Sequence, residues 1–521
     1  MSGKAPAIVW TVAGSDSSSG AGLQADLLAF HAFGVHGCSA VAAITAQNSV
    51  AVERIEAVAP DLLDAQLAAL AADLPPAAIK TGMLGSAANL KVLVAWIDRL
   101  RARNPSLAVV VDPVLRSSTG AVFADEALLE GYRRELLPRA TLATPNRAEA
   151  ATLLGLPALR NREHVARAAA ALRAAGCGAV AITGGDSRGE KSEDYAATSY
   201  ASGWLSLPRV PTPHHHGTGC VFASTAAAAL ASGFVAIDAL VLAKMATTHA
   251  LRRAQPAGAG AGPVRPHAGF ALHAGNLPGF SDGGQTGTPA FAALADPALG
   301  LYAIVDSAAW VRRVLDAGVR TVQLRIKDPL QPSLRAQVRD SVAAARAVGA
   351  QLFINDHWRV AIDESAYGVH LGQQDLETAD LSAISAAGLR LGVSTHSYWE
   401  VCRAWALRPS YIACGPIHPT RAKAMPWIPQ GEANLAYWCA LLPTPVVAIA
   451  GMDAGRARQA MLCGAAGVAV ISGITAAPSP EAAIAEFRQA IGAPAHTGRR
   501  PAPALPQSTL SGKEGSCCVR C

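Results

Sequence analysis

The sequence predicts two α/β domains, an open, doubly wound sheet followed by a (β/α)8 barrel. Short apolar, β-branched runs alternate with Ala/Leu-rich segments of helix length along most of the chain. This alternation is interrupted by a Gly-, Pro- and Ala-rich stretch near residues 255–300. With 521 residues the chain is also too long for one hydrophobic core, so more than one domain is expected.

The second half contains eight strand–helix alternations. The expected strands lie at 301–306, 321–328, 351–356, 367–372, 390–396, 411–417, 445–451 and 467–472. Eight such units in succession predict a closed parallel barrel. All its strands point their carboxyl ends to one face, so the polar residues at those ends are expected to meet at one active site.

The first half predicts the open sheet. Its expected strands lie at 7–14, 37–45, 77–82, 107–114, 140–145 and 178–184. Ligands of such sheets bind beyond the carboxyl ends of the strands. The predicted domains are 1–270 and 299–492, with a linker at 271–298 and a Pro-rich, then polar, disordered tail at 493–521.

Composition narrows the class of protein. Hydrophobic residues make up 51% and charged ones 16%, which suits large buried cores, and no apolar run approaches a membrane span. The N-terminus passes directly into an expected strand, which leaves no room for a secretory signal. The ten cysteines form no framework and fit a reducing cytoplasm. The net charge of +6 is thinly spread, so we expect small-molecule substrates, no nucleic acid and no membrane, with a homo-oligomer possible.

Charged and polar residues gather at the ends of the barrel strands. They are Gln323, Arg325, Lys327, Asn355, Asp356, Asp375, Ser394, Thr420, Lys423, Gly451, Ile471 and Ser472. Two carboxylates with three cations are typical of a magnesium-bridged diphosphate site, because Mg²⁺ prefers carboxylate and phosphate oxygens and Arg and Lys balance the remaining charge. Any one of these residues alone could be part of a rim salt bridge.

The motifs "VQLRIKD", "FIND", "GVHLGQQDL", "GVSTHS", "GPIHPTRAKAMP", "VVAIAGM" and "GVAVISGI" resemble those of thiamine-phosphate synthase over residues 299–490. The resemblance implies a barrel that joins a hydroxymethylpyrimidine diphosphate to a thiazole phosphate. It implies Mg²⁺ at Asp356 and Asp375, and the diphosphate at Arg325, Lys327, Asn355 and Lys423. By the same resemblance Gln323 and Ser394 meet the pyrimidine, and Thr420, Gly451, Ile471 and Ser472 hold the thiazole phosphate.

Two positions depart from that pattern. Ala422 stands where the family has a hydroxyl residue, and Ala450 replaces one glycine of a double glycine. A methyl group at position 450 is expected to crowd a phosphate-binding turn. These departures leave open a second reading, in which the barrel is catalytically impaired and serves a binding or regulatory role.

Two glycine-rich motifs mark the first domain. "VAGSDSSSGAGLQADL" (residues 12–27) is a turn that runs into a helix, and "HHHGTGC" (214–220) precedes another. The backbone N–H groups of 217–220, with Gly217 and Gly219, are expected to form an anion site at that helix N-terminus. Consecutive histidines point apart, so we expect the three to be solvated loop residues rather than ligands of one metal ion.

With "AITAQNS", "IKTGML", "VVDPV" and "TPNRAEA", these motifs resemble hydroxymethylpyrimidine/phosphomethylpyrimidine kinase, of the ribokinase-like superfamily, over residues 7–270. The resemblance implies ATP-dependent phosphorylation of the pyrimidine alcohol and then of its phosphate. It implies that Asp112 and Glu149 support Mg²⁺ and that Cys220 is catalytic, as a weak base or a positioning group, its thiol pKa lowered by the helix N-terminus. The implied pyrimidine pocket consists of Gly14, Ala21, Asp26, Gln47 and Met83.

Thr183 departs from this second family, which carries a lysine there near the ATP phosphates. Loss of a cation beside a transferring phosphoryl group lowers the rate unless another residue supplies the charge. Arg188 and Lys191 are nearby in sequence. The alternative reading is a pyrimidine-binding or salvage module that accepts pyridoxal-like substrates. The two resemblances concern neighbouring steps, and together they predict a bifunctional enzyme of thiamine biosynthesis.

Overall fold

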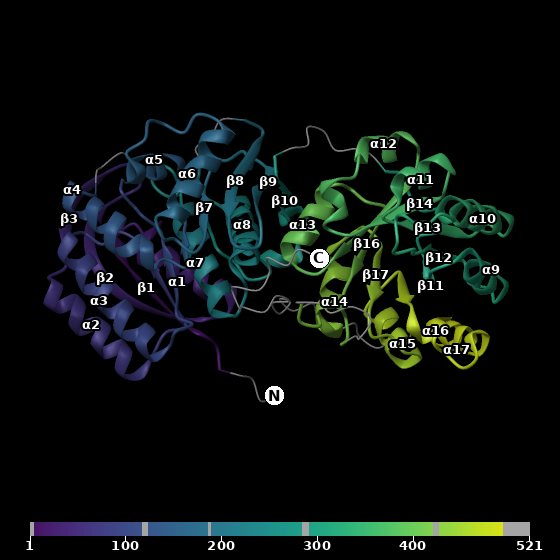
Figure 1. Cartoon of the computed structure of the whole chain (residues 1–521). Coiled ribbons are helices and arrows are strands. Elements are labelled where there is room, and N and C mark those ends of the chain that lie inside the picture. Colours follow the sequence, from purple (N-terminus) through teal and green to yellow (C-terminus); the bar gives the residue numbers. More distant parts are fainter. Residues whose placement is uncertain (1–4, 117–122, 186–188, 284–290, 420–426, 493–521) are drawn as a thin grey trace. The chain divides into compact units, whose positions relative to one another are not determined.

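The computed structural model describes residues 5–116, 123–185, 189–283, 291–419 and 427–492, so the predicted disordered tail lies outside the described residues. The chain divides into two compact units that meet in sequence near residue 284. Each is built from strands and helices in alternation (Figure 1). None of the helices in the described ranges is both long and apolar enough to cross a membrane.

The first unit is built on one ten-stranded sheet in the order β10-β9-β8-β7-β6-β5-β4-β1-β2-β3. β7, β6, β5, β4, β1 and β2 are parallel, whereas β3 at one edge and β8, β9 and β10 at the other pair antiparallel. The strands are β1 (Ile8–Asp16), β2 (His36–Gln47), β3 (Val52–Ala57), β4 (Ala78–Thr81), β5 (Ala108–Val111), β6 (Leu142–Ala143), β7 (Val180–Ile182), β8 (Lys191–Ala197), β9 (Ser202–Pro208) and β10 (Gly279–Ser281).

All six strands expected in this half are present, and β3, β8, β9 and β10 were missed. β8 reads "KSEDYAA" and β9 "SGWLSLP", which are polar at several positions because they lie toward the edge of the sheet. Edge strands tolerate such residues, and their sequences therefore lack the continuous apolar signal of buried parallel strands.

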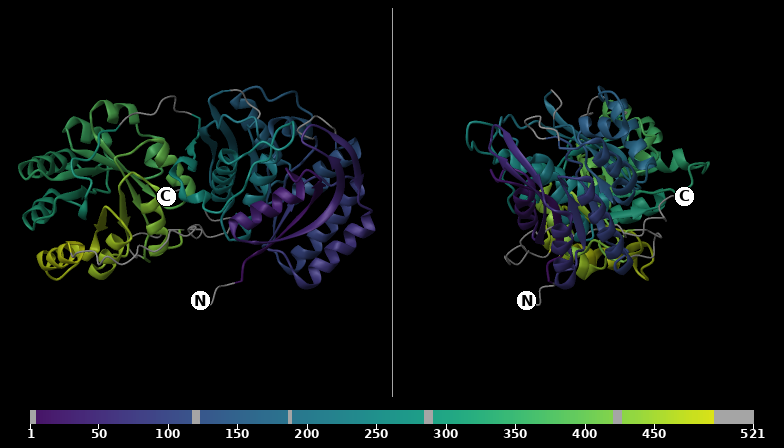
Figure 2. Two further views of the ribbon diagram at one scale, coloured as in Figure 1. Left: turned by 180° about the vertical axis from the view of Figure 1, so that it is seen from behind. Right: turned by 90° about the vertical axis from the view of Figure 1, so that its left-hand side faces the viewer.

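Helices cover both faces of this sheet (Figures 1 and 2). The group comprising α1 (Gly22–Phe33), α7 (Thr218–Ala231) and α8 (Ala236–Arg252) packs together on one side. The other group comprises α2 (Pro60–Asp73), α3 (Ala87–Arg103), α4 (Glu126–Gly131), α5 (Arg147–Leu154) and α6 (Arg162–Ala174). β1 lies between β2 and β4 in the sheet: the chain first adds β2 on one side of β1 and later adds β4 on the other side. The sheet therefore has a topological switch point between β1 and β4, where ligands of such folds bind.

The predicted linker, 271–298, is too long at both ends. Short 3-10 turns at Phe270–Leu272 and Ala274–Asn276 lead into β10, and the side chains of Asn276 and Phe280 are buried in the first unit. At the other end, Ala295 donates its N–H to the hydroxyl of Tyr367, in the barrel. At each end of the predicted linker, the described residues therefore pack on the unit that they adjoin.

The second unit is a closed, eight-stranded parallel barrel, as predicted. Its strands are β11 (Gly300–Val305), β12 (Thr321–Leu324), β13 (Gln351–Asn355), β14 (Gly368–Leu371), β15 (Arg390–Thr395), β16 (Tyr411–Cys414), β17 (Val446–Ile449) and β18 (Gly467–Val470). Its helices are α9 (Ala308–Asp316), α10 (Leu334–Ala347), α11 (Trp358–Asp363), α12 (Leu381–Ala386), α13 (Tyr398–Ala406), α14 (Gly431–Leu441), α15 (Ala454–Leu462), α16 (Ser472–Thr475) and α17 (Pro480–Gly492).

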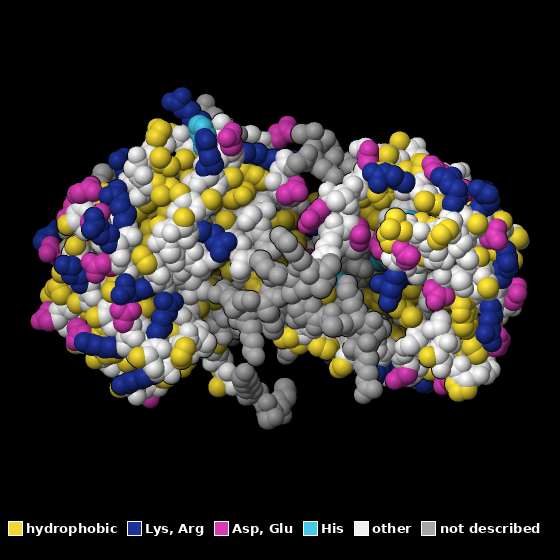
Figure 3. All heavy atoms as spheres, viewed as in Figure 1, with side chains coloured by type: hydrophobic (Ala, Val, Ile, Leu, Met, Phe, Trp, Pro, Cys, Tyr) yellow, Lys and Arg dark blue, Asp and Glu magenta, His cyan; other side chains and the backbone are white. Residues whose placement is uncertain are grey.

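Local sequence explains why these helices form and how they pack. The hydroxyl of Ser307 caps α9 by accepting the N–H of Trp310, and Val311, Val314 and Leu315 then fall on one buried face of the helix. On the surface drawn in Figure 3, Lys and Arg side chains are interspersed with Asp and Glu on both units. That pattern fits small-molecule chemistry better than the recognition of a polyanion.

Candidate active sites in the two units

Most of the residues predicted for the pyrimidine pocket lie near the switch point of the first unit. Gly14, near the end of β1, packs so closely on Met83 that a Cβ atom there would lie 2.3 Å from the Met83 methyl carbon. Ala21 is the N-cap of α1, and half-buried Gln47 ends β2, whose residue Thr45 pairs with Asp16 of β1. The fold therefore brings together four of the five residues predicted for this pocket.

Asp26 is the exception, and its predicted place in the pocket is wrong. The residue has no exposed surface, and its two carboxylate oxygens accept bonds from Thr11 Oγ1 (2.6 Å), Ser224 Oγ (2.7 Å) and Lys80 Nζ (2.9 and 3.0 Å). A carboxylate with this many internal donors has no oxygen turned toward a substrate. Asp26 is instead part of a buried charge network.

Lys80 is the centre of that network, and the sequence reading did not single it out. Its Nζ is fully buried and also lies 3.3 Å from Asp112 Oδ2. Burial alone would lower the pKa of this lysine, but the negative charges of Asp26 and then Asp112 outweigh it and raise the pKa. The available signal was a lysine in the middle of "AIKT", a strand whose residues are otherwise suited to a core.

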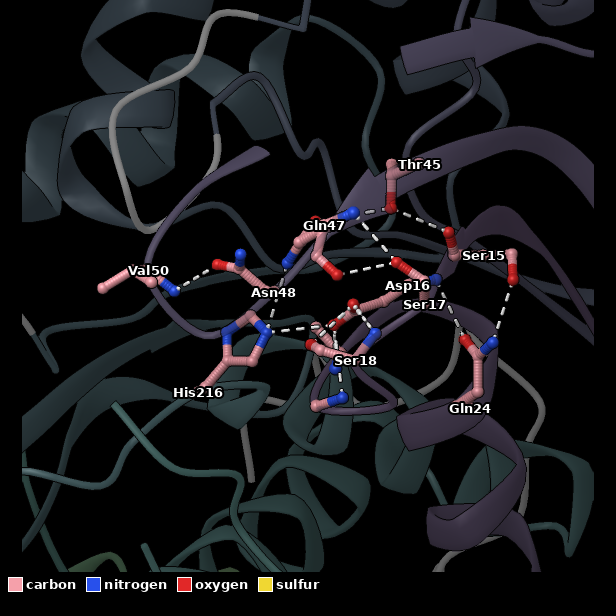
Figure 4. Close-up of polar contacts among 12 residues, drawn as sticks. Ser15, Asp16, Ser17, Ser18, Gln24, Thr45, Gln47, Asn48, Val50 and His216 are labelled. Atoms are coloured by element: carbon pink, nitrogen blue, oxygen red, sulfur yellow. Dashed lines mark hydrogen bonds and ion pairs between the residues drawn. The ribbon is translucent and has the colours of Figure 1, made fainter. Parts of the chain in front are cut away.

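The loop after β1 wraps around the carboxylate of Asp16 (Figure 4). Asp16 accepts bonds from the N–H and hydroxyl of Ser18, from the N–H groups of Gly20 and Ala21, and from His216 Nε2 at 3.0 Å. Burial would raise the pKa of Asp16, but the bonds from His216 and Ser18 outweigh it and lower the pKa to about 2. Asp16 therefore fills the N-terminus of α1 with a permanent internal anion.

Two of the three histidines are not the solvated loop residues that were predicted. The side chain of His216 is 12% exposed and bonded to Asp16, and His214 Nδ1 accepts the N–H of Gly262 at 3.1 Å. His215 is exposed. Among the described residues there is no cluster of three or more His, Cys, Asp or Glu side chains placed to bind a metal ion.

The second glycine motif forms the N-terminus of α7. Gly217 is the N-cap with φ of 85°, and it lies against the backbone of Gly20, where a Cβ atom would come within 2.2 Å of the Gly20 oxygen. Only glycine fits both that dihedral angle and that approach. Gly219 is exposed, with open space beyond its Cα atom. The start of α7 is therefore accessible, whereas that of α1 is filled by Asp16.

Cys220, the third residue of α7, does not have the lowered pKa that was predicted. Burial raises the pKa of its thiol to about 12, although the charge of Lys80 acts in the opposite direction. The desolvation cost of a thiolate here exceeds the benefit of the helix N-terminus. Cys220 is therefore protonated at neutral pH and is a hydrogen-bond donor rather than a base.

Asp112 lies immediately beyond β5 with polar atoms that suit a cation. Its Oδ2 is buried and accepts no hydrogen bond, and Thr144 Oγ1, in the neighbouring position beyond β6, is also buried without a partner. Burial raises the pKa of Asp112, partly offset by Lys80. Glu149 forms a capping box with Asn146 at the start of α5, its Oε2 accepting the Asn146 N–H at 2.8 Å. Asp112 and Thr144 therefore fit Mg²⁺, whereas Glu149 already uses one of its carboxylate oxygens in the capping box.

Thr183 follows β7 and pairs with Asn146 in an isolated parallel bridge. This bridge brings Arg147 to the neighbouring glycine: its Nη2 lies 3.5 Å from the position that a Gly184 Cβ atom would occupy. The Nε atom of Arg147 is buried without a hydrogen-bond partner. Of the cations considered from sequence, Lys191 is exposed on β8 and Arg188 lies outside the described residues. Arg147 was missed, and it is one cation that the fold places close to Gly184, the residue after Thr183.

In the barrel, the predicted metal carboxylates lie close together. Burial, and then the charge and hydrogen bond of Asp375, raise the pKa of Asp356 to about 6, while the nearby charge of Arg325 lowers it. The surroundings of these two carboxylates do little to balance their negative charge. Such a pair fits a divalent cation, because both residues offer the hard oxygen ligands that it prefers. Asn355 donates its side-chain N–H to Asp356, which fixes the orientation of this carboxylate. Lys327 is exposed after β12.

Beneath these charges, a chain of neutral polar side chains crosses the barrel interior. Tyr302 and Tyr411 share a hydrogen bond of 2.8 Å, Gln323 Nε2 donates to Tyr302 at 3.2 Å, and His370 bridges Tyr411 (2.7 Å) to Ser394 Oγ (2.8 Å). Burial and the charge of Arg325 lower the pKa of His370 to about 4, so the ring is neutral. The two residues predicted to meet the pyrimidine are thus joined through three that the sequence reading missed.

The remaining predicted residues lie at the ends of β17 and β18. Gly451 has φ of 68° and packs on His418, and Ile471 and Ser472 begin the short helix α16. Ala450 adopts φ of 81°, a left-handed conformation that costs an alanine about 1 kcal/mol or more. The crowding expected at Ala450 is therefore present as backbone strain. Thr420, Ala422 and Lys423 lie outside the described residues.

Comparison with known protein families identifies both units. The family model for phosphomethylpyrimidine kinase matches residues 16–265, and that for thiamine monophosphate synthase matches residues 301–474. A probable chloroplastic thiamine-biosynthetic bifunctional enzyme from Oryza sativa subsp. japonica is 34% identical over 489 residues, covering 90% of this chain and 86% of its own. This chain belongs to the bifunctional thiamine-biosynthetic enzymes. It carries a phosphomethylpyrimidine kinase domain and a thiamine-phosphate synthase domain.

Relatives of each domain are also found separately. The thiamine-phosphate synthase of Salmonella newport is 53% identical over 190 residues, covering 36% of this bifunctional chain and 90% of the relative. A phosphomethylpyrimidine kinase structure from Clostridium difficile is 31% identical, with a TM-score of 0.41, covering 47% of this chain and 99% of its own. A pyridoxal kinase structure from Bacillus subtilis, an ADP complex, is 31% identical with a TM-score of 0.46, covering 50% and 98%. The comparisons give no support to an impaired barrel.

Proposed function

We propose that the two domains catalyse consecutive steps with the residues assigned above. The kinase domain transfers phosphate from ATP to hydroxymethylpyrimidine and then to its phosphate, and the barrel joins the resulting diphosphate to thiazole phosphate, releasing diphosphate. The observation that carries this proposal is the pairing of Asp356 with Asp375: burial, and then the charge of Asp375, raise the pKa of Asp356 to about 6. Such a pair is stable in its charged form only when a cation lies between the carboxylates.

In the kinase domain, Gly14, Ala21, Gln47 and Met83 line the proposed pyrimidine pocket, and the N–H groups from Gly217 to Cys220 receive the transferred phosphate. Cys220 donates its thiol proton as a hydrogen bond to a substrate oxygen, because burial keeps it protonated. Asp112, with Glu149 nearby, holds Mg²⁺, which neutralises phosphate charge when bound. Arg147 supplies the cation that Thr183 lacks.

In the barrel, Asp356 and Asp375 hold Mg²⁺, which withdraws charge from the departing diphosphate when bound. Arg325, Lys327 and Asn355 grip the same diphosphate, together with Lys423. Gln323 and Ser394, held by the neutral chain beneath them, position the pyrimidine so that its methylene carbon faces the thiazole nitrogen. Loss of diphosphate leaves a benzyl-like cation that this nitrogen captures, so no general base is needed. Thr420, Gly451 and the backbone at Ile471 and Ser472 hold the thiazole phosphate.

The test is thiamine-phosphate formation by the full chain, given the pyrimidine diphosphate, thiazole phosphate and Mg²⁺ without ATP. Asp356→Ala is expected to lower turnover by about 10²–10³-fold, since it removes one ligand of a charge-stabilising cation. Asp363→Asn, an exposed carboxylate in α11, is the matched control and should leave turnover unchanged. A wild-type chain that consumes ATP with the pyrimidine alcohol but makes no thiamine phosphate would refute the proposal for the barrel.

The proposal includes the cellular setting predicted from sequence, a cytoplasmic protein with small-molecule substrates. All seven cysteines of the described residues are free thiols, which supports a reducing compartment. Fractionation of the native organism's cells, with the activity assayed in each fraction, tests this location. Recovery of the activity in a membrane or organelle fraction would contradict it.

A further inference from the structure

His216 precedes the glycine motif of α7, and neither proposed reaction assigns it a role. Its ring lies against Gly20, where a Cβ atom would come within 2.2 Å of the ring carbon Cδ2. Its side chain is 12% exposed. The ring is therefore held in one place by the same loop that carries Asp16 and Ala21, at the border of the proposed pyrimidine pocket.

Two groups compete for one ring nitrogen. His216 Nε2 lies 3.0 Å from Asp16 Oδ2 and 3.4 Å from Gln47 Nε2 (Figure 4). Asp16 is ionised and can only accept hydrogen bonds, so the ring nitrogen that faces it must carry a proton. A protonated nitrogen cannot also accept a bond from the amide N–H₂ of Gln47, and two donors that face each other repel.

The other neighbour of Gln47 leads to the same conclusion. Thr45 Oγ1 donates its proton to the Ser15 carbonyl oxygen at 3.0 Å, and it lies 3.5 Å from Gln47 Oε1. A hydroxyl that has given its proton to a carbonyl presents only lone pairs to other groups. Thr45 therefore suits the N–H₂ end of the Gln47 amide, and His216 suits its oxygen end. Half a turn about the last side-chain bond exchanges the two ends without any change of shape.

We propose that the Asp16–His216 pair is a specificity-determining positioning device. By holding a proton on His216 Nε2, Asp16 fixes which end of the Gln47 amide faces the ring and which end remains for the substrate. An aminopyrimidine has a ring nitrogen acceptor next to an amino donor, so an amide in a fixed orientation can match both groups. Pyridoxal has a methyl group, which donates no hydrogen bond, next to its ring nitrogen, so it lacks this edge and does not benefit. The inference rests on the proposed role of Gln47 in the pyrimidine pocket.

The test compares His216→Phe with wild type in the full chain, using ATP with hydroxymethylpyrimidine and, separately, with pyridoxal. The Phe variant is expected to raise KM for the pyrimidine about tenfold with a smaller change in kcat, because it removes one orienting hydrogen bond. Its preference for the pyrimidine over pyridoxal should fall by a similar factor. The synthase turnover of the barrel in the same preparation reports whether the chain is intact.

Two further variants separate positioning from packing. His216→Gln keeps an N–H₂ group that can donate to Asp16 and should retain most of the preference, whereas His215→Phe, at the exposed neighbour, should change neither KM nor preference. Equal losses in His216→Gln and His216→Phe would overturn the inference, as would an unchanged preference in the Phe variant. Should His216→Phe not fold, His216→Ser, which cannot reach Asp16, replaces it with the same expected result.

The proposed function and this inference fail in different ways. A wild-type chain that phosphorylates neither compound would contradict the proposed kinase reaction. A wild-type chain that prefers the pyrimidine, with variants that keep the preference, would contradict only the role of His216.

Discussion

Two strand-end carboxylates, Asp16 in the kinase domain and Asp356 in the barrel, have pKa values that are shifted in opposite directions. The pKa of Asp16 is lowered to about 2, because hydrogen bonds from His216 and Ser18 outweigh its burial. The pKa of Asp356 is raised to about 6, because it is buried beside Asp375. Hydrogen bonds from nearby residues therefore stabilise the charged form of Asp16, whereas the surroundings of Asp356 disfavour its charged form.

The same contrast holds for the groups beneath each site. The kinase domain buries charges, with Lys80 between Asp26 and Asp112, whereas the barrel buries the neutral chain from Tyr302 to His370. Buried charges are tolerated only in pairs, while neutral groups need only hydrogen bonds. In the kinase domain Lys80 and Asp26 therefore hold their charges for structure, with Asp112 proposed to serve a ligand as well, whereas in the barrel both Asp356 and Asp375 are proposed to serve a ligand.

The largest expected effect comes from breaking the buried charges of the kinase domain. Lys80→Met should cost about 3–5 kcal/mol of unfolding free energy, because Asp26 and Asp112 are left buried without a cation. Urea unfolding, followed by kinase activity and by circular dichroism, measures the loss. Arg54→Ala, which breaks an exposed pair with Glu56, is the control and should cost less than about 1 kcal/mol. A Lys80 variant as stable as that control would break the comparison.

The next effect is the pH dependence of the two carboxylates in Mg²⁺-free buffer. The folded pKa of Asp16 is below its ordinary value of 3.8, so its contribution, about 2 kcal/mol, is complete above about pH 4 and is lost as the pH falls toward 2. The folded pKa of Asp356 is above that value, so stability decreases as the pH rises from about 4 to 6.

The variants Asp16→Asn and Asp375→Asn test these opposite slopes. Asp16→Asn should lose the change in unfolding free energy between about pH 4 and 2, and Asp375→Asn should weaken the change between about pH 4 and 6, because burial still acts on Asp356. Asp375→Asn should also raise barrel stability at neutral pH, since it removes the repulsion, while lowering synthase turnover. If the contributions of Asp16 and Asp356 to the unfolding free energy changed with pH in the same direction, the contrast between the two domains would be contradicted.

A smaller effect is expected at Thr183, where the kinase domain departs from the pattern of its family. Thr183 lacks the cation expected there, and the fold places Arg147 close to Gly184, the next residue. Arg147→Leu should lower kinase kcat/KM for ATP about tenfold, because it removes one charge from the phosphates. Thr183→Lys in the same chain should restore most of it, and Arg167→Leu, on the exposed side of α6, should have no effect. Failure of the lysine to rescue would show that Arg147 acts elsewhere.

In the barrel, the departure from the family pattern is Ala450. The change in stability expected from its substitution is the smallest of the four effects. Ala450→Gly should raise the unfolding free energy of the barrel by about 1 kcal/mol, because glycine adopts φ of 81° without strain. Ala448→Gly, in β17, should instead be destabilising, and thermal unfolding of the pair gives the comparison. A loss of stability in Ala450→Gly would show that the methyl group contributes more by packing than it costs.

The sequence by itself determined the two architectures and predicted candidate site residues within them. Apolar periodicity placed the parallel strands, since these are buried on both faces, and the polar strand ends located Asp356, Asp375 and Gln323. It could not give the antiparallel edge strands, whose residues are largely polar, nor the extent of the linker, because Phe280 and Asn276 are recognised as core residues only once their partners are known.

Only the tertiary structure decided which charged groups serve the fold and which serve a ligand. Asp16 and Asp26 both look like site carboxylates in a glycine-rich motif, yet their partners, His216 and Ser224, are about 200 residues away in sequence. Likewise Cys220 begins a helix, which favours a thiolate, but its burial decides otherwise. Local pattern specifies where a residue stands on a strand or helix, whereas its charge state depends on solvent exclusion and on neighbours that only the folded chain brings together.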